Sequence, residues 1–207
     1  MSKKIEKDTE SKILNAAKRV FVQKGLDGAR MQEIADEAGI NKALLHYYFR
    51  SKEKLFITIF KVELNNFFPR LIPVLLSNET TYELKIQHFV EEYIELFLRN
   101  PFLPAFVLRE VNRNPELIAQ FIAESDINAG QIKDVMKVLS HELGLSVNEV
   151  LHLMVTVVSS CIFPFASKPI IEQVLFDGNE GNYQKFLGER KKYVADFVIN
   201  FLKGKIK

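Results

Sequence analysis

Cysteine is almost absent from this chain, since Cys161 is the single one among 207 residues. One cysteine excludes an intramolecular disulfide and a zinc centre built from several cysteines. The histidines also lack metal-ligand spacing; they are His46, His88, His141 and His152. We therefore expect no metal and no cofactor, and we interpret Cys161 as a small buried residue.

The glycine-based motifs of common enzyme classes are missing as well. The sequence has no G-x-S-x-G element, no P-loop and no dinucleotide-binding glycine pattern. The adjacent carboxylates Glu91 and Glu92 are expected on a solvated helix face. With no catalytic constellation to point to, we predict that the protein is not an enzyme.

Long apolar runs are equally scarce. The first residues, "MSKKIEKDTESK", are charged throughout and have no apolar signal-peptide core, so we expect a cytoplasmic protein. The one apolar stretch, residues 150–166, is shorter than the roughly 20 residues of a spanning helix. It also contains His152 and Pro164. We interpret it as a helix buried in protein and expect no membrane association.

The charge that is present is unevenly distributed. The net charge is +2, but residues 1–54 hold 12 Lys and Arg against 8 Asp and Glu, whereas residues 55–207 hold 16 against 18. Clustered Lys and Arg attract phosphates through the release of counterions. The basic first quarter is therefore a weak indication of a polyanionic partner.

Apolar residues recur with a helical period almost everywhere, and no alternating strand pattern is present. One stripe, Ile13, Ala17, Val20 and Phe21, lies on a helix that ends near Gly25. Similar stripes predict helices over 82–99 and 183–203, and Asn114-Pro115 predicts another helix start. Pro69 and Pro73 predict a kink or an end in the helix that begins near Ser51. The chain is predicted to be all-α.

Residues 31–49 have the pattern of a helix-turn-helix. "MQEIADEA" predicts a two-turn helix, Gly39 allows a tight turn, and Asn41 caps a second helix, "KALLHYYF". Leu45 and Phe49 are expected to face the core. The opposite side presents Lys42, Ala43, His46 and Tyr47, whose Lys, His and Tyr tips suit phosphates and base edges. The second helix is therefore predicted to enter a DNA major groove.

The run "IADEAGINKALLHYYFRSKEKLF", with the A-x-x-x-F-x-x-x-G spacing at Ala17, Phe21 and Gly25, resembles the N-terminal domain of TetR-family transcriptional regulators, AcrR-like members included. The resemblance covers roughly residues 9–60. It implies a helix-turn-helix domain over residues 1–52 and a larger helical effector-binding and dimerisation domain over residues 53–207. It also implies a homodimer on a palindromic operator, most often a repressor, released by a small effector.

Carried over position by position, the resemblance implies six DNA-contact residues: Gln32, Lys42, Ala43, His46, Tyr47 and Lys52. Ser51 caps the next helix, whose first N–H groups, together with Lys52, are expected to hold a phosphate. The sequence departs from the family pattern at Arg30, where a Ser or Thr usually caps the first motif helix. It also departs at Leu44 and in the order of His46 and Tyr47. The operator sequence therefore stays undetermined.

Two segments are predicted to form a dimer interface, residues 147–165 and 183–203. Two such helices from each subunit would form a four-helix bundle, the geometry that the family implies. The alternative is that both helices only complete the core of one chain.

An effector pocket is expected among the aromatic residues of the larger domain, and an apolar or aromatic effector follows from it. The candidate lining is Phe67, Phe89, Tyr93, Phe97, Phe106, Arg109 and Phe121. Core packing is the alternative for each of these residues. A second function class, a helical small-molecule-binding protein or enzyme with a vestigial helix-turn-helix, also stays open.

Overall fold

The computed structural model describes residues 2–113, 115–116 and 129–205. Every element in these residues is a helix, which confirms the all-α prediction. In chain order the helices are α1 (Ser2–Gly28), α2 (Met31–Ala38), α3 (Lys42–Tyr48), α4 (Lys52–Leu76), α5 (Tyr82–Arg99), α6 (Leu103–Arg113), α8 (Ala129–Leu143), α9 (Val147–Ala166), α10 (Lys168–Ile170), the π-helical turn η1 (Ile171–Leu175) and α11 (Glu180–Lys205).

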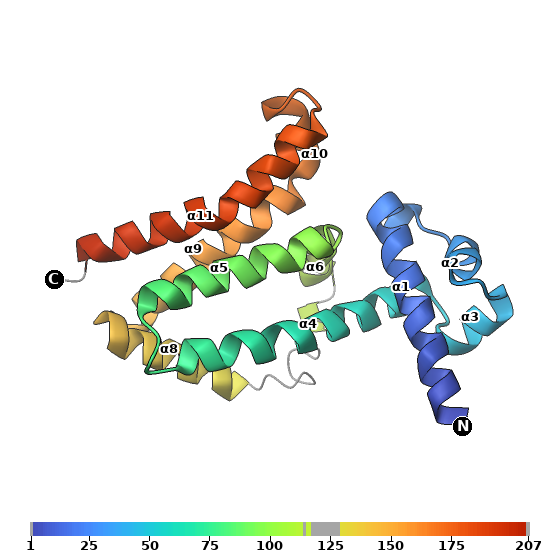
Figure 1. Cartoon of the computed structure of the whole chain (residues 1–207), viewed down its shortest axis with the longest axis horizontal. Helices are drawn as coiled ribbons and strands as arrows, with labels where there is room; N and C mark the ends of the chain where they lie inside the picture. The colour runs from blue at the N-terminus through green and yellow to red at the C-terminus, as the bar shows by residue number, and fades with distance from the viewer. Residues whose placement is uncertain (1, 114, 117–128, 206–207) are drawn as a thin grey trace.

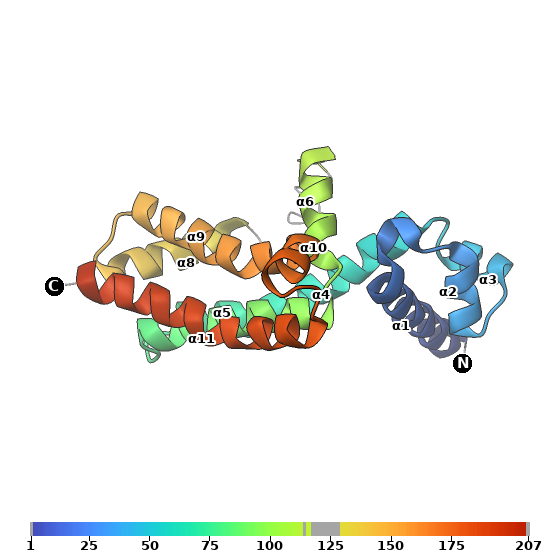
Figure 2. The same ribbon diagram turned by 90° about the horizontal axis from the view of Figure 1, so that it is seen from above.

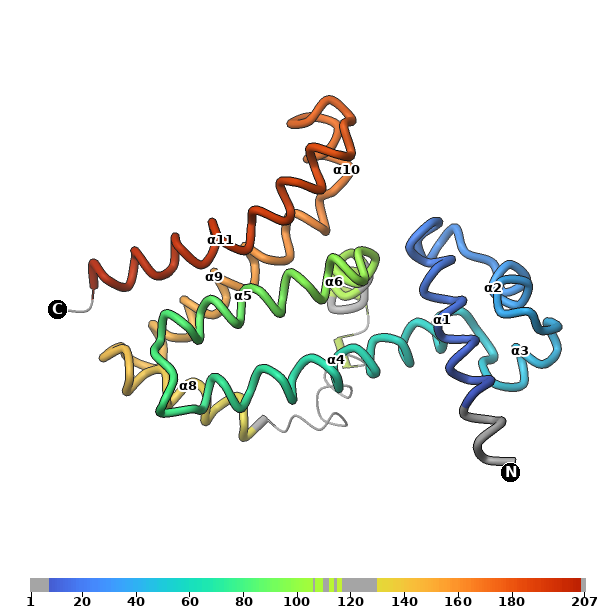
Figure 3. Tube along the Cα trace, viewed as in Figure 1, coloured from blue at the N-terminus to red at the C-terminus, as the bar shows by residue number. Residues whose placement is uncertain are grey.

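The molecule is elongated, with a small three-helix unit at one end (Figure 1). Helices α1, α2 and α3 form this unit, and α4 extends from it along the remaining helices. The view from above shows the same arrangement, with α1 and the C-terminal end of α11 at opposite ends (Figure 2). The Cα trace shows that α4 is the long connection between the two parts (Figure 3).

The small unit is held by the residues that the helical period selects. Ile13, Ala17 and Phe21 of α1 are fully buried, and Ile34 of α2 and Leu45 of α3 pack into the same core. Gly25 has a φ of 65°, so the helical path of α1 is interrupted there. This agrees with the predicted helix end at Gly25, although a last turn follows as far as Gly28.

Helix α4 does not end at its prolines, which corrects one of the two expectations for this segment. Pro69 and Pro73 both lie inside the continuous helix, and both are exposed. They are four residues apart and therefore share the solvent side, where water can satisfy the carbonyl groups that lose a partner. Phe67 and Leu71 on the other side are buried and hold the helix against its neighbours.

Helix α5 lies at the centre of the larger part and contacts α4, α8, α9 and α11. Its predicted stripe is confirmed, with Val90, Ile94 and Phe97 buried. The helix begins at the Thr81 cap and ends at Asn100. The predicted helix start at Asn114 lies outside the described residues.

Among the described residues, α9 is the one helix long and apolar enough to cross a membrane by length and composition. It packs against α5, α6, α8 and α11 in this chain. Val150, Val157 and Cys161 are buried on one side, whereas Leu151 and Val155 on the other side are exposed. The helix therefore contributes to the protein core with one face and leaves an apolar face uncovered.

Candidate functional site

The turn between α2 and α3 has the geometry that the sequence predicts. Gly39 adopts φ 66° and ψ 33°, a left-handed conformation that favours glycine. The N–H of Ile40 donates to the carbonyl of Ala35 at 3.0 Å, closing the end of α2. Asn41 then caps α3, because its Oδ1 accepts from the N–H of Leu44 at 2.8 Å. The two short helices are thus fixed at a defined angle.

Helix α3 has one buried and one exposed side. Leu45 is fully buried and Phe49, just after the helix, is 7% exposed. The other side presents four exposed residues, all of them predicted DNA contacts: Lys42, Ala43, His46 and Tyr47. The Tyr47 ring is 76% exposed. It meets the Tyr48 ring edge-on, with centroids 5.4 Å apart. The exposed side therefore carries a charge and two aromatic rings with hydrogen-bonding tips.

The start of α2 compensates for its unusual cap. Arg30 occupies the N-cap position and its side chain has no acceptor, so it cannot cap the helix as Ser or Thr does. Instead, Glu33 accepts from the backbone N–H of Arg30 at 3.1 Å. Glu33 also pairs with Lys24 of α1 at 2.7 Å. The hydrogen bond from Lys24, and then the one from Arg30, lower the pKa of the Glu33 carboxyl.

Two further predicted contacts already have partners within the chain. Gln32 is exposed on α2, and its Nε2 donates to Asp36 Oδ1 at 2.8 Å. Lys52 donates from Nζ to the carbonyl oxygens of Asp27 at 3.0 Å and Ala29 at 3.2 Å. These two bonds leave one N–H of the ammonium group for another partner. Lys52 therefore ties the α1–α2 connection to the start of α4, and its phosphate contact stays a prediction.

Two basic residues that the sequence interpretation did not include flank the motif. Arg30 precedes α2 and Arg50 follows α3, and both are exposed. Exposed Arg side chains at the two ends of a helix-turn-helix can donate hydrogen bonds to phosphate groups. The signal that could have identified them is their position, since Arg30 is the N-cap residue of α2 and Arg50 directly precedes Ser51, the N-cap residue of α4.

The small unit and the larger part meet at an aromatic cluster. The rings of Phe21 from α1 and Phe56 from α4 lie 5.5 Å apart. Phe102, between α5 and α6, contacts both, at 5.9 Å from Phe21 and 5.3 Å from Phe56. All three rings are buried, so α4 packs directly on α1 through them.

Ion pairs reinforce the same junction. Lys18 of α1 pairs with Glu63 of α4, which is 8% exposed. Arg109 of α6 pairs with Asp27 at the end of α1 at 2.9 Å. Arg109, expected from the sequence at the effector pocket, thus lies at the junction in this structure.

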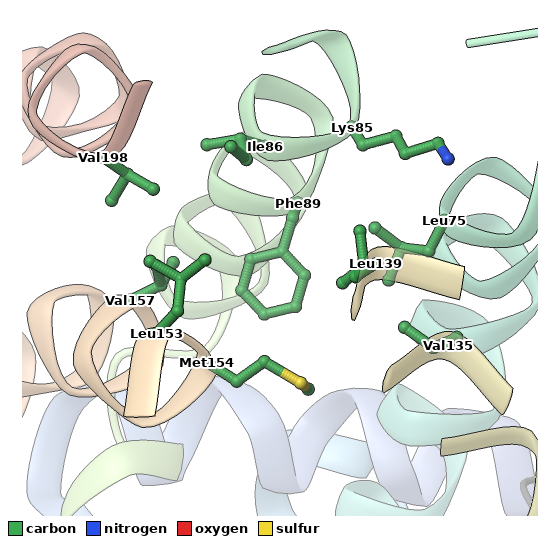
Figure 4. Close-up of a pocket in the computed structure, with 10 residues that line it drawn as sticks. All are labelled: Leu75, Lys85, Ile86, Phe89, Val135, Leu139, Leu153, Met154, Val157 and Val198. Atoms are coloured by element: carbon green, nitrogen blue, oxygen red, sulfur yellow. The ribbon is translucent and has the colours of Figure 1, made fainter. Parts of the chain in front are cut away.

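An apolar cavity of about 50 Å³ lies inside the larger part, away from the junction (Figure 4). Of its ten lining residues, nine are apolar and the tenth is Lys85. They come from five helices and include Leu75 of α4, Phe89 of α5, Leu139 of α8, Met154 of α9 and Val198 of α11. The cavity is smaller than the 300–1,000 Å³ of a typical drug-sized site.

The predicted pocket aromatics form a continuous chain of ring contacts. Tyr93 contacts Phe67 at 5.3 Å, Phe89 at 5.3 Å and Phe97 at 5.2 Å, and Phe97 contacts Phe165 at 5.4 Å. Burial raises the pKa of the Tyr93 hydroxyl. Of these predicted residues Phe89 lines the cavity. The side chain of Phe106 and the whole of Phe121 lie outside the described residues.

Residues 13–59 match the family model for bacterial regulatory proteins of the tetR family. This segment begins within α1, includes α2 and α3, and ends near the start of α4. The chain belongs to the TetR family.

Two curated relatives of this TetR-family chain match the same region. The transcriptional repressor NicS of Pseudomonas putida is 45% identical over 51 residues, 25% of this chain and 24% of NicS. The transcriptional activator FasR of Mycolicibacterium smegmatis is 37% identical over 59 residues, 28% of this chain and 27% of FasR. The match thus spans about a quarter of the length of these relatives.

A solved structure extends the likeness to most of the chain. HlyIIR, a hemolysin II transcriptional regulator, is 25% identical with a TM-score of 0.55, over 83% of this chain and 94% of that chain. The larger helical part therefore also has the fold of a TetR-family protein.

The TetR-family chain has one more notable surface, on α9 and α11. Six large apolar or aromatic side chains are exposed on these two helices: Leu151, Val155, Phe163, Tyr193, Phe197 and Phe201. Between the two helices runs a groove of about 360 Å³, lined by residues that include His152, Thr156 and Phe197. We call this the α9–α11 face. The groove is also lined by Glu149 and Lys205, and exposed apolar side chains gathered on two neighbouring helices are typical of a protein interaction site.

Proposed function

We propose that this protein is a DNA-binding transcriptional regulator that binds a palindromic operator as a homodimer and is released by a small effector. The observation that carries the proposal is the two-sided α3, with Leu45 fully buried and Tyr47 76% exposed. The buried side fixes the helix, so the exposed side is presented in a constant orientation.

In the proposed complex α3 lies in the major groove. Lys42, Ala43, His46 and Tyr47 face the bases and the neighbouring phosphates, and Gln32 contacts DNA from α2. The first N–H groups of α4, together with the remaining N–H of Lys52, hold a phosphate. The small domain of residues 1–52 carries these contacts, and residues 53–207 carry the effector and the dimer interface.

A second copy of the chain is the proposed occupant of the α9–α11 face, which is the helix pair predicted from residues 147–165 and 183–203. Each chain contributes two helices to a four-helix bundle. Two copies related by a two-fold axis present two α3 helices, and successive major grooves lie roughly 34–36 Å apart. Dimerisation is therefore what gives a short recognition helix sufficient affinity.

Helix α4 supplies the proposed connection between effector and DNA. It begins directly after α3, and Leu75 near its other end lines the cavity. With 25 residues it is about 37 Å long. An effector that occupies the cavity favours a conformer in which α4 tilts, and the Phe21–Phe56 contact passes this shift to α1. A roughly 100-fold preference for that conformer corresponds to about 2.7 kcal/mol per site.

The proposed sign of regulation is repression, and the proposed location is the cytoplasm. NicS, with the higher identity of the two relatives, is a repressor, whereas FasR is an activator. A repressor can act by occupying the operator alone, so this proposal requires no surface that contacts the transcription machinery.

The test is a fluorescence-anisotropy titration of the full chain against the DNA upstream of its own gene, beside a scrambled duplex. We expect tight binding to the native duplex only, and weaker binding at higher salt because counterions are released. Equal and feeble binding to both duplexes, followed by no enrichment in a genome-wide selection for bound sequences, would contradict the proposal and favour a vestigial helix-turn-helix.

A further inference from the structure

Three aliphatic side chains are exposed on the short turn that joins α9 to α11. Ile170, at the end of α10, is 66% exposed, and Val174 and Leu175 of η1 are 68% and 67% exposed. Single exposed aliphatic residues are ordinary on a protein surface, but three within residues 170–175 form a local apolar surface. We call residues 168–175 the α10–η1 turn.

The α10–η1 turn is held in place from its inner side by α9 and α11. Tyr183 of α11 is 1% exposed, and its hydroxyl donates to the carbonyl of Pro164 at 3.0 Å. Lys168 pairs with Glu172 and with Glu180, each at 3.4 Å. The turn therefore presents its aliphatic side chains in a fixed arrangement. A preformed surface of this kind loses little conformational entropy when it binds a partner.

The α10–η1 turn continues the α9–α11 face. Phe163 on that face is 65% exposed, and its carbonyl accepts from the N–H of Ser167, the residue before the turn, at 2.9 Å. Figure 1 and Figure 2 show α10 at the end of α9 and α11 that is nearer to the small unit and farther from the C-terminus. The exposed apolar surface thus extends beyond the two long helices, toward the DNA-binding end of the molecule.

The charges around the α10–η1 turn do not suit a nucleic acid or an anionic membrane. Residues 167–180 hold one lysine against three acidic residues. Phosphates and anionic lipid headgroups are attracted by clustered Lys and Arg, which this segment lacks. An apolar protein surface fits these side chains, because their burial gains free energy where water is excluded. The proposed second copy already covers the surface that continues from the turn.

The symmetry of the proposed dimer brings both α10–η1 turns to the same end. Both α3 helices must face one DNA duplex, so the two-fold axis points toward the DNA-binding end of the molecule. A contact across this axis is isologous, which means that the turn of each chain meets the same surface of the other chain. The exposed apolar side chain of α9 that precedes the turn is Phe163.

We propose that the α10–η1 turn of each chain packs across the two-fold axis against the end of α9 in the second copy, where Phe163 is exposed. This inference rests on the proposed homodimer. It adds a contact that lies outside the two long helices of the four-helix bundle and that is formed twice in each dimer.

The test is sedimentation equilibrium of the full chain without DNA, with Val174→Asp and Leu175→Asp. Each variant places a carboxylate in both copies of the proposed contact, so the dissociation constant of the dimer should rise at least about tenfold. Gln173→Asp is the matched control and should leave the constant unchanged, because it adds the same charge to the same turn while the Gln173 side chain lies beside Gly178. An unchanged constant for both test variants overturns the proposal and leaves the turn to a partner other than this chain.

A second measurement identifies the surface that the turn meets and does not depend on an added charge. Val174→Cys and Phe163→Cys are co-expressed on differently tagged chains, and a short bismaleimide should link them into a heterodimer. The unsubstituted chain is the control, because its single cysteine, Cys161, is 1% exposed and should not react. The absence of links between the two kinds of chain would contradict the proposed contact.

Failure of this inference is distinguishable from failure of the proposed dimer. If Phe197→Asp gives monomers while both turn variants keep the dissociation constant of the unsubstituted chain, the α9–α11 interface stands and the inference about the turn is wrong. If the turn variants weaken the dimer while Phe197→Asp does not, the turn contact is supported and the helix interface is contradicted. A chain that is monomeric at high micromolar concentration contradicts both.

Discussion

Helices α3 and α11 both expose large aromatic side chains, but of different kinds. On α3 the exposed ring is Tyr47, with Lys42 and His46 on the same side. On α11 the exposed rings are Tyr193, at 67%, and Phe197 and Phe201, at 65% and 51%, so two of the three have no hydrogen-bonding group. A Tyr or His ring keeps a hydrogen-bonding tip for phosphates and base edges, whereas a Phe ring offers only apolar surface.

This difference distinguishes a surface that suits a charged, hydrated partner from a surface that suits an apolar partner. The α3 side suits nucleic acid, whose recognition depends on hydrogen bonds and charge. The α9–α11 face suits another apolar protein surface, because burial of Phe rings gains free energy only where water is excluded. Exposure alone therefore does not indicate which partner a surface binds. The presence or absence of hydrogen-bonding groups on the exposed side chains distinguishes a nucleic-acid surface from an apolar protein interface.

The inner side of α3 gives the largest expected effect. Leu45→Ala should lower the free energy of unfolding by about 2–5 kcal/mol, because it leaves a cavity in the core of the small domain. The adjacent Leu44→Ala is the matched control, since Leu44 is 37% exposed. Urea denaturation of both variants measures the difference. Equal losses would show that the two sides of α3 do not differ as described.

The apolar character of α11 is tested by Phe197→Asp. A carboxylate at this position would be buried in the proposed dimer, so the dimer should weaken at least about 100-fold. Sedimentation at micromolar concentration should then show monomers. Val22→Asp changes an exposed apolar residue of α1 outside the α9–α11 face and should remain dimeric. A dimeric Phe197→Asp variant would place the interface elsewhere.

The polar character of α3 is tested by Lys42→Ala and Tyr47→Ala. Each should weaken operator binding by about tenfold and leave the oligomeric state unchanged, with Lys137→Ala as an exposed control. Tyr47→Phe makes α3 resemble α11, because it keeps the ring and removes the hydroxyl. Full affinity of Tyr47→Phe would show that the hydrogen-bonding tip is not what distinguishes the two helices.

The smallest expected effect concerns two glutamates in the first turns of helices, Glu33 in α2 of the small domain and Glu149 in α9 of the larger part. The pKa values of Glu33 and Glu149 are both lowered, Glu33 first by the hydrogen bond from Lys24 and Glu149 first by the backbone N–H of Ser146. Each ionised carboxylate thus stabilises the fold above its ordinary pKa of 4.5, and this contribution is lost as the pH falls through the lowered value.

Glu33→Gln and Glu149→Gln should therefore each slightly lower the thermal unfolding midpoint at neutral pH and flatten its decrease in acid. High salt should reduce the Glu33→Gln effect, because an exposed ion pair with Lys24 is screened. It should affect Glu149→Gln less, since a backbone hydrogen bond is the larger cause there. Equal salt sensitivity of the two variants would contradict this assignment of causes.

The helix-turn-helix was predictable because each of its features is local. Gly39 and Asn41 specify the turn and the cap within a few residues, and Leu45 and Phe49 mark the buried side by their spacing. The stripes of α1 and α5 were predictable for the same reason. The hydrogen bonds that Lys52 makes within the chain were not predictable, because they join it to Asp27 and Ala29, more than 20 positions away.

The larger part was less predictable because its helices are apolar on more than one side. Aromatic content indicated a pocket, but Phe67, Tyr93 and Phe97 pack on one another, and the cavity lies among aliphatic residues from five helices. The single polar residue that lines the cavity is Lys85. In the sequence it lies within the predicted helix 82–99, and nothing in the pattern there distinguishes it from an exposed lysine. Pro69 and Pro73 indicated a kink or an end, but α4 continues through both, and the buried residues on its opposite side hold it against its neighbours.

The sequence by itself determined the helices, their caps and the two-sided α3, since backbone preference and apolar period act within one or two turns. Only the tertiary structure decided which apolar sides face each other, where the cavity lies and that Lys85 borders it. The helical period selects the face of a helix that is buried, but the identity of its partner depends on how distant helices pack.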